Sequence, residues 1–371
     1  MKISKLTFVL FVILICSNTA FSQNLIMEND VKTQRFGKDI YYKDWKNNPL
    51  DGHYKIADDR GNYSDVHFKN GKKDGKNTEY DYKGRVLKTT TYKNGKGEGT
   101  YTTFHQNGKI RKTGEFVNGE ENGKWEDFDD KGEIKNIEYY ENGKKTGKWW
   151  KKKFNGQNQT TTYVTENYKD DDYFGHSEEK GEDGILLWER EYINSQTYTH
   201  KGYYSNAKLY VIRHLKEGKV DGEKIEYNQD GVLKSKMLFK EDQLKKSTKY
   251  FANGNKELTY NYNSGKKNGL SESYNDKGIK IEEGNFKSDY KNGIWKRYDS
   301  RDGHLLYETT FADNVKNGIA KEYNKANKVS AEGMFKNNEK NGVWKHYNLA
   351  GKLKKEVSYN LGKEISTKVY K

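Results

Sequence analysis

The residues that most often carry catalysis or bind metals are scattered along this chain. Eight histidines are spread over 371 residues, and none forms the His-Glu-x-x-His pattern that places two zinc ligands on one helix. His105 and His304 fall in predicted hairpin turns, so we interpret them as solvated turn residues. The acidic run 170–172 lacks the oxygen-ligand spacing of a calcium loop and is interpreted as a solvated loop.

Motifs for nucleophiles and phosphate binding are equally weak. The segment 95–99, Gly-Lys-Gly-Glu-Gly, superficially resembles a phosphate loop, but no helical pattern follows it. The chain has no Gly-x-Ser-x-Gly motif, and its one cysteine, Cys16, lies in a segment that we expect to be removed. The sequence therefore predicts no catalytic residue, no metal site, no cofactor and no enzyme. A glycan hydrolase with two facing carboxylates in a cleft is the enzymatic alternative.

The N-terminus has the pattern of a secretory signal peptide. Lys2 and Lys5 precede an apolar run at 6–16. Small residues, Ala20 and Ser22, stand at the two positions that a signal peptidase recognises. We expect residues 1–22 to be cleaved off and the chain to be exported to the periplasm, the outer envelope or the medium. An uncleaved N-terminal anchor is the alternative.

The composition favours a thin sheet over a thick globular core. Hydrophobic residues make up 32% and charged residues 33%, which would suit a disordered chain. However, aromatic residues reach 14% and Pro49 is the single proline, whereas disordered chains are usually poor in aromatics and richer in proline. Many tyrosines and glycines indicate a fold with a high ratio of surface to volume.

The positive charge of the chain does not indicate nucleic-acid binding. The formal net charge is +14, which becomes +12 without Lys2 and Lys5. Only eight of the 68 basic residues are arginine, and the lysines are spread along the whole chain instead of forming one basic face. Weak attraction to anionic lipid or polysaccharide fits this pattern better.

A repeat of 24 residues runs through the sequence. Asn-Gly pairs recur at this interval, at Asn70, Asn94, Asn118 and Asn142. A glycine follows five residues after each of these asparagines, and another glycine nine residues later. The first of these glycine positions, here called the first-glycine column, continues in both directions and comprises Gly52, Gly75, Gly99, Gly123, Gly147, Gly222, Gly269, Gly293, Gly318 and Gly342. Such columns indicate tandem structural units.

Each unit has the pattern of a β-hairpin. Large aromatic residues stand two and five residues after the first glycine, and a polar turn ending in glycine follows. The second half of the unit alternates between two faces with period two, as in the segment 110–116, which is typical of a strand. Small residues at Gly114, Gly284 and Gly333 leave room for a ring of the neighbouring hairpin, and the Asn-Gly loop returns the chain.

Because a lone hairpin is marginal in water, neighbouring units must stabilise one another. The predicted fold is all-β, with tandem hairpins of about 24 residues in an elongated, twisted, antiparallel, single-layer sheet. The predicted organisation is a signal peptide at 1–22, an N-terminal segment and capping half-repeat at 23–51, a first repeat array at 52–150, an irregular insertion or degenerate repeats at 151–198, and a second array with a C-terminal cap at 199–371.

Two segments carry a resemblance to a known family. Residues 118–134 (Asn-Gly-Glu-Glu-Asn-Gly-Lys-Trp-Glu-Asp-Phe-Asp-Asp-Lys-Gly-Glu-Ile) and 340–353 (Lys-Asn-Gly-Val-Trp-Lys-His-Tyr-Asn-Leu-Ala-Gly-Lys-Leu) resemble the MORN repeat variant, within a similarity that spans 37–371. The resemblance implies serial β-hairpins in elongated sheets, association with proteins or phospholipids and no catalysis. It also implies, for some secreted bacterial members, an antitoxin-like role. The broken units at 151–198 and the missing glycine near Lys245 depart from the pattern.

The aromatic columns are the candidates for a binding face. These candidates are Trp125, Trp149, Trp295, Trp344, Tyr298 and Tyr347. Exposed aromatic residues often mark binding, but one ring per repeat also suits packing between hairpins. We expect a non-enzymatic scaffolding module with an unidentified protein partner. The alternatives are a peripheral binder of anionic lipid or polysaccharide and an immunity protein against a co-encoded toxin.

Overall fold

The computed structural model describes residues 24–371, so the predicted signal peptide at 1–22 lies outside the described residues. The chain divides into two compact units, which we describe separately. Unit 1 ends at Tyr173, and unit 2 comprises Phe174–Lys371. Apart from one short 3-10 turn, η1 (Glu28–Asp30), the regular structure of the described residues is β-strand. The described residues include no helix long and apolar enough to cross a bilayer.

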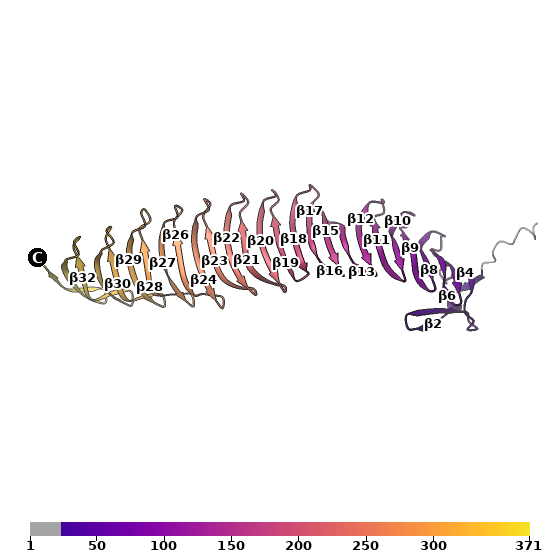
Figure 1. Cartoon of the computed structure of the whole chain (residues 1–371), viewed down its shortest axis with the longest axis horizontal. Coiled ribbons are helices and arrows are strands. Elements are labelled where there is room, and N and C mark those ends of the chain that lie inside the picture. The colour runs from indigo at the N-terminus through magenta and orange to yellow at the C-terminus, as the bar shows by residue number, and fades with distance from the viewer. Residues whose placement is uncertain (1–23) are drawn as a thin grey trace, which may run out of the picture. The chain divides into compact units, whose positions relative to one another are not determined.

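Unit 1 consists of a sheet of consecutive hairpins and one separate hairpin (Figure 1). The separate hairpin pairs β2 (Lys32–Phe36) with β3 (Asp39–Lys43). At the edge of the sheet, β1 (Asn24–Met27) runs parallel to β4 (Gly52–Ala57), whereas the other pairs given for this unit are antiparallel. The remaining strands are β5 (Tyr63–Lys69), β6 (Lys72–Lys73), β7 (Gly75–Tyr80), β8 (Val86–Lys93), β9 (Lys96–Phe104), β10 (Ile110–Val117), β11 (Glu120–Phe128), β12 (Ile134–Glu141), β13 (Lys144–Lys145), β14 (Gly147–Asn155), β15 (Thr160–Lys169) and β16 (Asp172–Tyr173).

Unit 2 is a single layer of antiparallel hairpins whose sequence neighbours lie side by side (Figure 1). Its strands are β17 (Gly175–Gly181), β18 (Leu186–Asn194), β19 (Thr197–Tyr203), β20 (Leu209–Lys216), β21 (Lys219–Tyr227), β22 (Leu233–Lys240), β23 (Gln243–Tyr250), β24 (Lys256–Asn263), β25 (Lys266–Lys267), β26 (Gly269–Tyr274), β27 (Lys280–Lys287), β28 (Tyr290–Tyr298), β29 (Leu305–Ala312), β30 (Val315–Tyr323), β31 (Val329–Lys336), β32 (Glu339–Tyr347), β33 (Leu353–Asn360) and β34 (Lys363–Val369). The predicted all-β class, built from consecutive hairpins in an open antiparallel sheet, is confirmed.

In the segment 151–198 the structure contains regular strands. The nine consecutive residue pairs of β14 and β15 run from Gly147–Tyr168 to Asn155–Thr160 without a register shift. The longer spacing of the repeat at this point therefore lengthens a hairpin. Asp170 and Asp171, with φ of 51° and 71°, form the two-residue turn that follows.

The two-residue turns between repeat units keep one geometry although their residues vary. Asn118 and Gly119 both have positive φ, 55° and 87°, as a type I′ turn requires. Ser288 and Asp289 adopt the same conformation, with φ of 50° and 74°. The fold therefore imposes the left-handed conformation even where glycine is absent.

Hydrogen bonds explain why aspartate or asparagine replaces glycine in these turns. The backbone N–H of Asp289 donates to the carbonyl oxygen of Lys267 in the preceding unit at 3.0 Å, and Asp289 Oδ1 accepts the N–H of Lys267 at 2.8 Å. Asn314 makes the same pair of contacts with Lys291, and Asn338 makes them with Lys316. Each of these turns therefore fixes the register of one hairpin against its neighbour.

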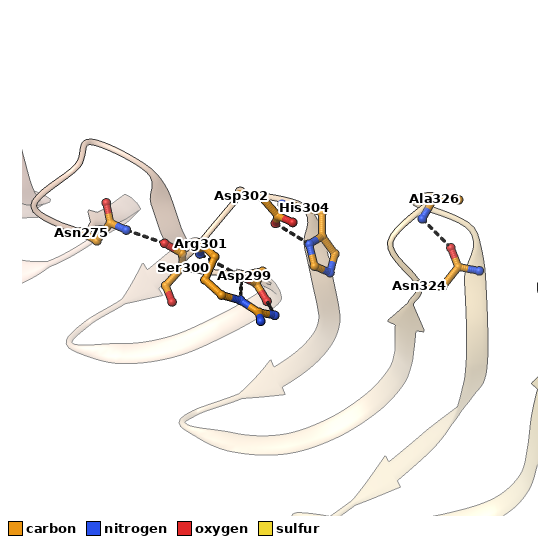
Figure 2. A network of polar contacts seen from close by, with 8 residues as sticks. All are labelled: Asn275, Asp299, Ser300, Arg301, Asp302, His304, Asn324 and Ala326. Atoms are coloured by element: carbon orange, nitrogen blue, oxygen red, sulfur yellow. Dashed lines mark hydrogen bonds and ion pairs between the residues drawn. The ribbon is translucent and has the colours of Figure 1, made fainter.

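The turns at the other end of the hairpins are closed by a side-chain oxygen. Asp129 Oδ1 accepts the backbone N–H groups of Lys131 and Glu133, at 2.9 and 2.8 Å. These turns also contact one another, because Asn275 Nδ2 donates to the carbonyl oxygen of Ser300 in the next turn at 2.7 Å (Figure 2). Both ends of each hairpin are thus tied by short polar contacts.

In six repeats the glycine of the first-glycine column lies in a β-bulge against the preceding strand. These are Gly99, Gly123, Gly222, Gly293, Gly318 and Gly342. All ten glycines of the column have positive φ, between 65° and 122°. At Gly123 the register between the two strands shifts, because one residue of β10, Gly114, faces three residues of β11, from Gly123 to Trp125. Bulges of this kind increase the local twist and change the direction of a side chain. Here the bulge places the indole of Trp125 over the bare backbone of Gly114.

The core of each unit is a series of rings on one face of the sheet, which we call the ladder face. In unit 1 successive ring centroids lie 4.9–6.4 Å apart through Tyr101, Phe116, Trp125, Tyr140, Trp149 and Tyr168. In unit 2 the same spacing, 5.0–6.4 Å, joins Tyr260, Phe286, Trp295 and Phe311, and Phe335 lies 5.3 Å from Trp344. Each such ring pair contributes about 0.5–1.5 kcal/mol beyond the burial of its area.

Glycine is required opposite the tryptophans for a steric reason. A Cβ atom built on Gly114 would lie 2.1 Å from Trp125, and one on Gly284 or Gly333 would lie 2.2 or 2.4 Å from Trp295 or Trp344. The prediction that these three small residues make room for a neighbouring ring is confirmed.

Replacing one of these glycines tests the ring ladder. We expect Gly114→Ala to lower the free energy of unfolding by about 1–3 kcal/mol, because the added methyl group cannot share space with the buried indole. Urea unfolding followed by tryptophan fluorescence measures this change. Gly156→Ala is the matched control, because its Cβ would lie 4.0 Å from the nearest atom, in Phe154. Equal unfolding midpoints for the two variants would contradict the packing described here.

Candidate binding faces

The four tryptophans predicted as binding candidates are buried in the ladder. The exposed fractions of Trp125, Trp149, Trp295 and Trp344 are 1%, 8%, 4% and 0%. Three of the indole N–H groups are also bonded internally. Trp149 donates to the carbonyl oxygen of Tyr139 at 3.0 Å, and Trp295 and Trp344 donate to those of Asn285 and Met334 at 3.1 Å. These rings serve packing between hairpins, and a partner could reach them only by displacing their neighbours.

Lysine side chains cover the rings from the solvent side. Lys291 Nζ lies 3.9 Å from the centroid of the Trp295 ring, and Lys340 Nζ lies 3.9 Å from that of Trp344. In both of these repeats the lysine stands two residues before the first glycine, and the tryptophan stands two residues after it. Because an ammonium group is attracted to the face of an aromatic ring, part of the positive charge of the chain is committed to the core.

The two tyrosines predicted as candidates lie on the other side of the sheet, which we call the opposite face. Tyr298 Oη donates to Glu283 Oε1 at 2.7 Å, and Tyr347 Oη donates to Glu332 Oε1 at 2.7 Å. Burial, followed by the hydrogen bond to Glu283, raises the pKa of Tyr298 to about 12. Both hydroxyl groups therefore donate to a fixed carboxylate partner.

Lysine and glutamate alternate along the centre of this opposite face in unit 2. Each residue is the direct cross-strand partner of the next, and this charge row comprises Glu283, Lys296, Glu308, Lys321, Glu332, Lys345, Glu356 and Lys368. Opposite charges on neighbouring strands stabilise a sheet modestly. The alternation also leaves this part of the surface without a strong field of either sign.

Beside the charge row runs a line of exposed apolar side chains. These five residues are between 44% and 60% exposed, and we call them the apolar row: Leu270, Ile294, Ile319, Met334 and Val343. Four of them directly follow a glycine of the first-glycine column, and Met334 is the cross-strand partner of Ile319. The sequence signal of this row is an apolar residue directly after the first glycine, which is a different position from the aromatic columns predicted as candidates.

Unit 1 carries a separate apolar patch on its opposite face. A shallow depression there is lined by Ile134, Ile137, Tyr139, Thr146, Gly147, Lys148 and Trp150. The ring of Trp150 stacks on that of Tyr163, with centroids 5.7 Å apart and an angle of 22° between the planes. Period two places Trp149 and Trp150 on opposite faces. The aromatic columns predict only Trp149 as a candidate, although Trp150 is the more accessible of the two.

Polar residues replace the rings at the start of unit 2. The residues that stand where other units have tryptophan include Ser177, His200 and Lys224. His200 is 5% exposed and is the direct cross-strand partner of both Arg190 and Arg213. Burial, together with the charges of Arg213 and Arg190, lowers the pKa of His200 to about 4, so the imidazole is neutral at pH 7.

One turn of unit 2 holds a compact group of polar side chains (Figure 2). Ligand atoms of Asp299, Asp302 and His304 lie within 4.8 Å of one another, but Arg301 donates to both carboxylate oxygens of Asp299, at 3.0 and 2.7 Å. These bonds hold the pKa of Asp299 well below its usual range. His304 Nδ1 lies 2.6 Å from Asp302 Oδ1. We interpret the group as stabilising a turn that has one residue more than its counterparts.

The fold and its faces define a repeat protein made of tandem β-hairpins. Three segments of the chain match the family model of the MORN repeat variant, at residues 97–118, 220–241 and 340–361. Each begins shortly before a glycine of the first-glycine column and ends in the following two-residue turn. The resemblance identified from the sequence is confirmed at these three segments.

Other comparisons add little to this assignment. No curated protein sequence shows a significant match to the chain. Among solved structures, a porin-like protein from Bacteroides uniformis ATCC 8492 is similar at 11% sequence identity and a TM-score of 0.14, over 60% of this chain and 94% of that chain.

The buried histidine gives a prediction about acid stability. His200 has a pKa of about 4 in the folded chain and 6.5 as its ordinary value, so the unfolded chain takes up this proton first as the pH falls. Its neutral form therefore supports folding above pH 6.5, and this support is lost as the pH falls toward 4. Between pH 7 and pH 5 we expect the wild type to lose up to about 2 kcal/mol more than His200→Gln. Urea unfolding at both pH values measures the loss of stability in each protein. An equal loss in the wild type and in His200→Gln would contradict the lowered pKa of His200.

Proposed function

We propose that this protein is a non-enzymatic binding module that recognises a protein partner through the opposite face of unit 2. The observation that carries the proposal is the apolar row, in which five side chains between 44% and 60% exposed recur with the repeat. Ile319, Met334 and Val343 lie on three adjacent strands, whereas Asn285 and Thr310 separate Leu270, Ile294 and Ile319 from one another. Exposed apolar side chains grouped on a soluble surface mark interaction sites. The charge row beside them would supply orientation, because alternating charges fit one register of a partner better than others.

The distribution of lysine supports a protein partner over an anionic lipid or polysaccharide. On the ladder face, Lys291 and Lys340 lie over rings and also lie near Glu282 and Glu322, at 2.9 and 3.7 Å. On the opposite face, Lys296, Lys321 and Lys345 each have glutamate partners on both neighbouring strands, and Lys368 on the last strand has Glu356 as its partner. A polyanion is best held by a continuous field of one sign, and neither pattern provides one.

The place of action belongs to the same proposal. The pattern at residues 1–22 leads us to propose export, so the module would work in the periplasm, in the outer envelope or outside the cell. A toxin encoded beside this protein is one partner that the resemblance to the MORN repeat variant implies. No residue is assigned a catalytic role.

Charge substitutions in the apolar row test the proposal. We expect the double variant Ile294→Asp with Ile319→Asp to lose capture of a partner from envelope and secreted extracts, because two carboxylates would have to be desolvated at the interface. Affinity capture followed by mass spectrometry compares this variant with the wild type. Leu349→Asp is the matched control, because Leu349 is an apolar turn residue with 82% exposure outside the row.

Two outcomes would contradict this proposal. The first is equal capture by the wild type and the double variant. The second is binding to anionic liposomes or acidic polysaccharide that disappears as salt is raised, with no protein captured at all. That result would favour the peripheral binder, because exposed charges are screened beyond about 8 Å at physiological ionic strength.

A further inference from the structure

The ladder face of unit 2 contains a row of basic residues in repeats that lack the column tryptophan. Arg190 on β18, His200 on β19 and Arg213 on β20 are successive cross-strand partners, and Lys224 on β21 is the partner of Arg213. Arginine is rare in this chain, with eight residues in 371, and two of them flank one buried histidine. We call Arg190, His200 and Arg213 the arginine row.

The guanidinium of Arg190 is held in place by neutral groups. Its Nε donates to His200 Nδ1 at 3.2 Å, and its Nη1 donates to Tyr192 Oη at 2.9 Å. The same group lies over the rings of Trp188 and Tyr198, 4.6 and 5.4 Å from their centroids. The side chain is therefore oriented without any of these contacts neutralising its charge.

The guanidinium of Arg213 has fewer hydrogen-bond partners than that of Arg190. Its Nε atom is buried and has no hydrogen-bond partner. A buried donor without an acceptor costs about 1–3 kcal/mol. Such an atom, two strands away from a second guanidinium and one strand away from a buried histidine, is a reason to expect an acceptor from outside the chain.

Three glutamates on the surrounding strands have other partners. Glu179, the cross-strand partner of Trp188, accepts from the Trp188 indole N–H at 2.7 Å. Glu226 on the ladder face accepts from Ser235 at 3.0 Å and pairs with Lys224 at 2.7 Å. Glu189 lies on the opposite face of β18, where Lys201 and the hydroxyl group of Tyr203 contact it at 2.7 and 2.9 Å. The positive charge of the row is thus not balanced by these glutamates.

We propose that the arginine row is a binding site for an oxyanion, a carboxylate, sulfate or phosphate group held between Arg190 and Arg213 beside His200. Guanidinium groups bind such anions through paired, charge-assisted hydrogen bonds. The two arginines are two strands apart, roughly 10 Å between their backbones at a strand spacing of about 4.8 Å, so their side chains can converge on one small group. Because His200 Nδ1 accepts from Arg190, the neutral ring carries its proton on Nε2 and offers a third donor.

This site lies on the ladder face, whereas the proposed partner surface lies on the opposite face. The two proposals can therefore be tested independently of each other. A chain that captures its protein partner without binding an oxyanion would refute only the second.

Titration with simple anions tests the site. The purified full-length protein, labelled with ¹³C at the histidine rings, is titrated separately with sulfate, inorganic phosphate and malonate at constant ionic strength. We expect a saturable shift of the His200 ring signal, assigned with His200→Gln, and the tightest of the three anions identifies the chemical class. Arg213→Met and Arg190→Met should each weaken binding by at least about tenfold, because each removes charged hydrogen bonds.

A matched variant and a folding check keep the test decisive. Arg297→Met removes an arginine from the ladder face of β28, away from the arginine row, and should leave the titration unchanged. Arg213→Lys keeps the charge without the fork and should also bind more weakly than the wild type. Thermal unfolding shows whether each variant remains folded. A His200 shift that does not saturate, or that is the same in wild type and folded Arg213→Met, would overturn the proposal.

Discussion

The structure depends on how a single layer of β-strands can bury an indole ring. With no second layer above it, each tryptophan must find its cover within its own sheet. The bulge at the first glycine meets this need, because it sets one residue of the preceding strand against three residues of the next. The single residue is glycine at Gly114, Gly284 and Gly333, so the indole can lie on the backbone. Neighbouring rings and a lysine complete its surroundings.

This constraint links the turns to the core. A slip of one residue would move each ring to the other face, so the register between hairpins must be fixed strongly. The two-residue turns help to fix it through paired hydrogen bonds such as those between Asp289 and Lys267. The same bonds explain why asparagine and aspartate stand at positive φ where glycine would be the easier choice.

The same constraint also divides the two faces by function. Because the rings of the ladder face are packed and covered, they are poor candidates for recognition. The opposite face is free of that requirement and carries the charge row and the apolar row. At the start of unit 2, where the repeats lack the column tryptophan, the ladder face instead holds two arginines around a buried neutral histidine. This departure from the ring packing coincides with the proposed oxyanion site.

The sequence by itself determined the repeat length, the strand alternation, the turns and the pairing of small residues with rings. These features depend on local backbone preferences and period-two geometry, which act over a few residues. It did not determine which face would be packed. Trp149 and Trp150 are adjacent and equally apolar, and the ring contacts with Tyr140 and Tyr168 on one face of the sheet bury the first.

Only the tertiary structure shows which charged and apolar side chains become neighbours in the charge row, the apolar row and the arginine row. The charge row joins residues from eight strands, and the arginine row joins three, so no short segment reveals either. The pKa of His200 depends on burial and on two arginines that are ten and thirteen positions away in the chain. Burial and cross-strand pairing are properties of the assembled sheet, because they exist only once the hairpins lie side by side.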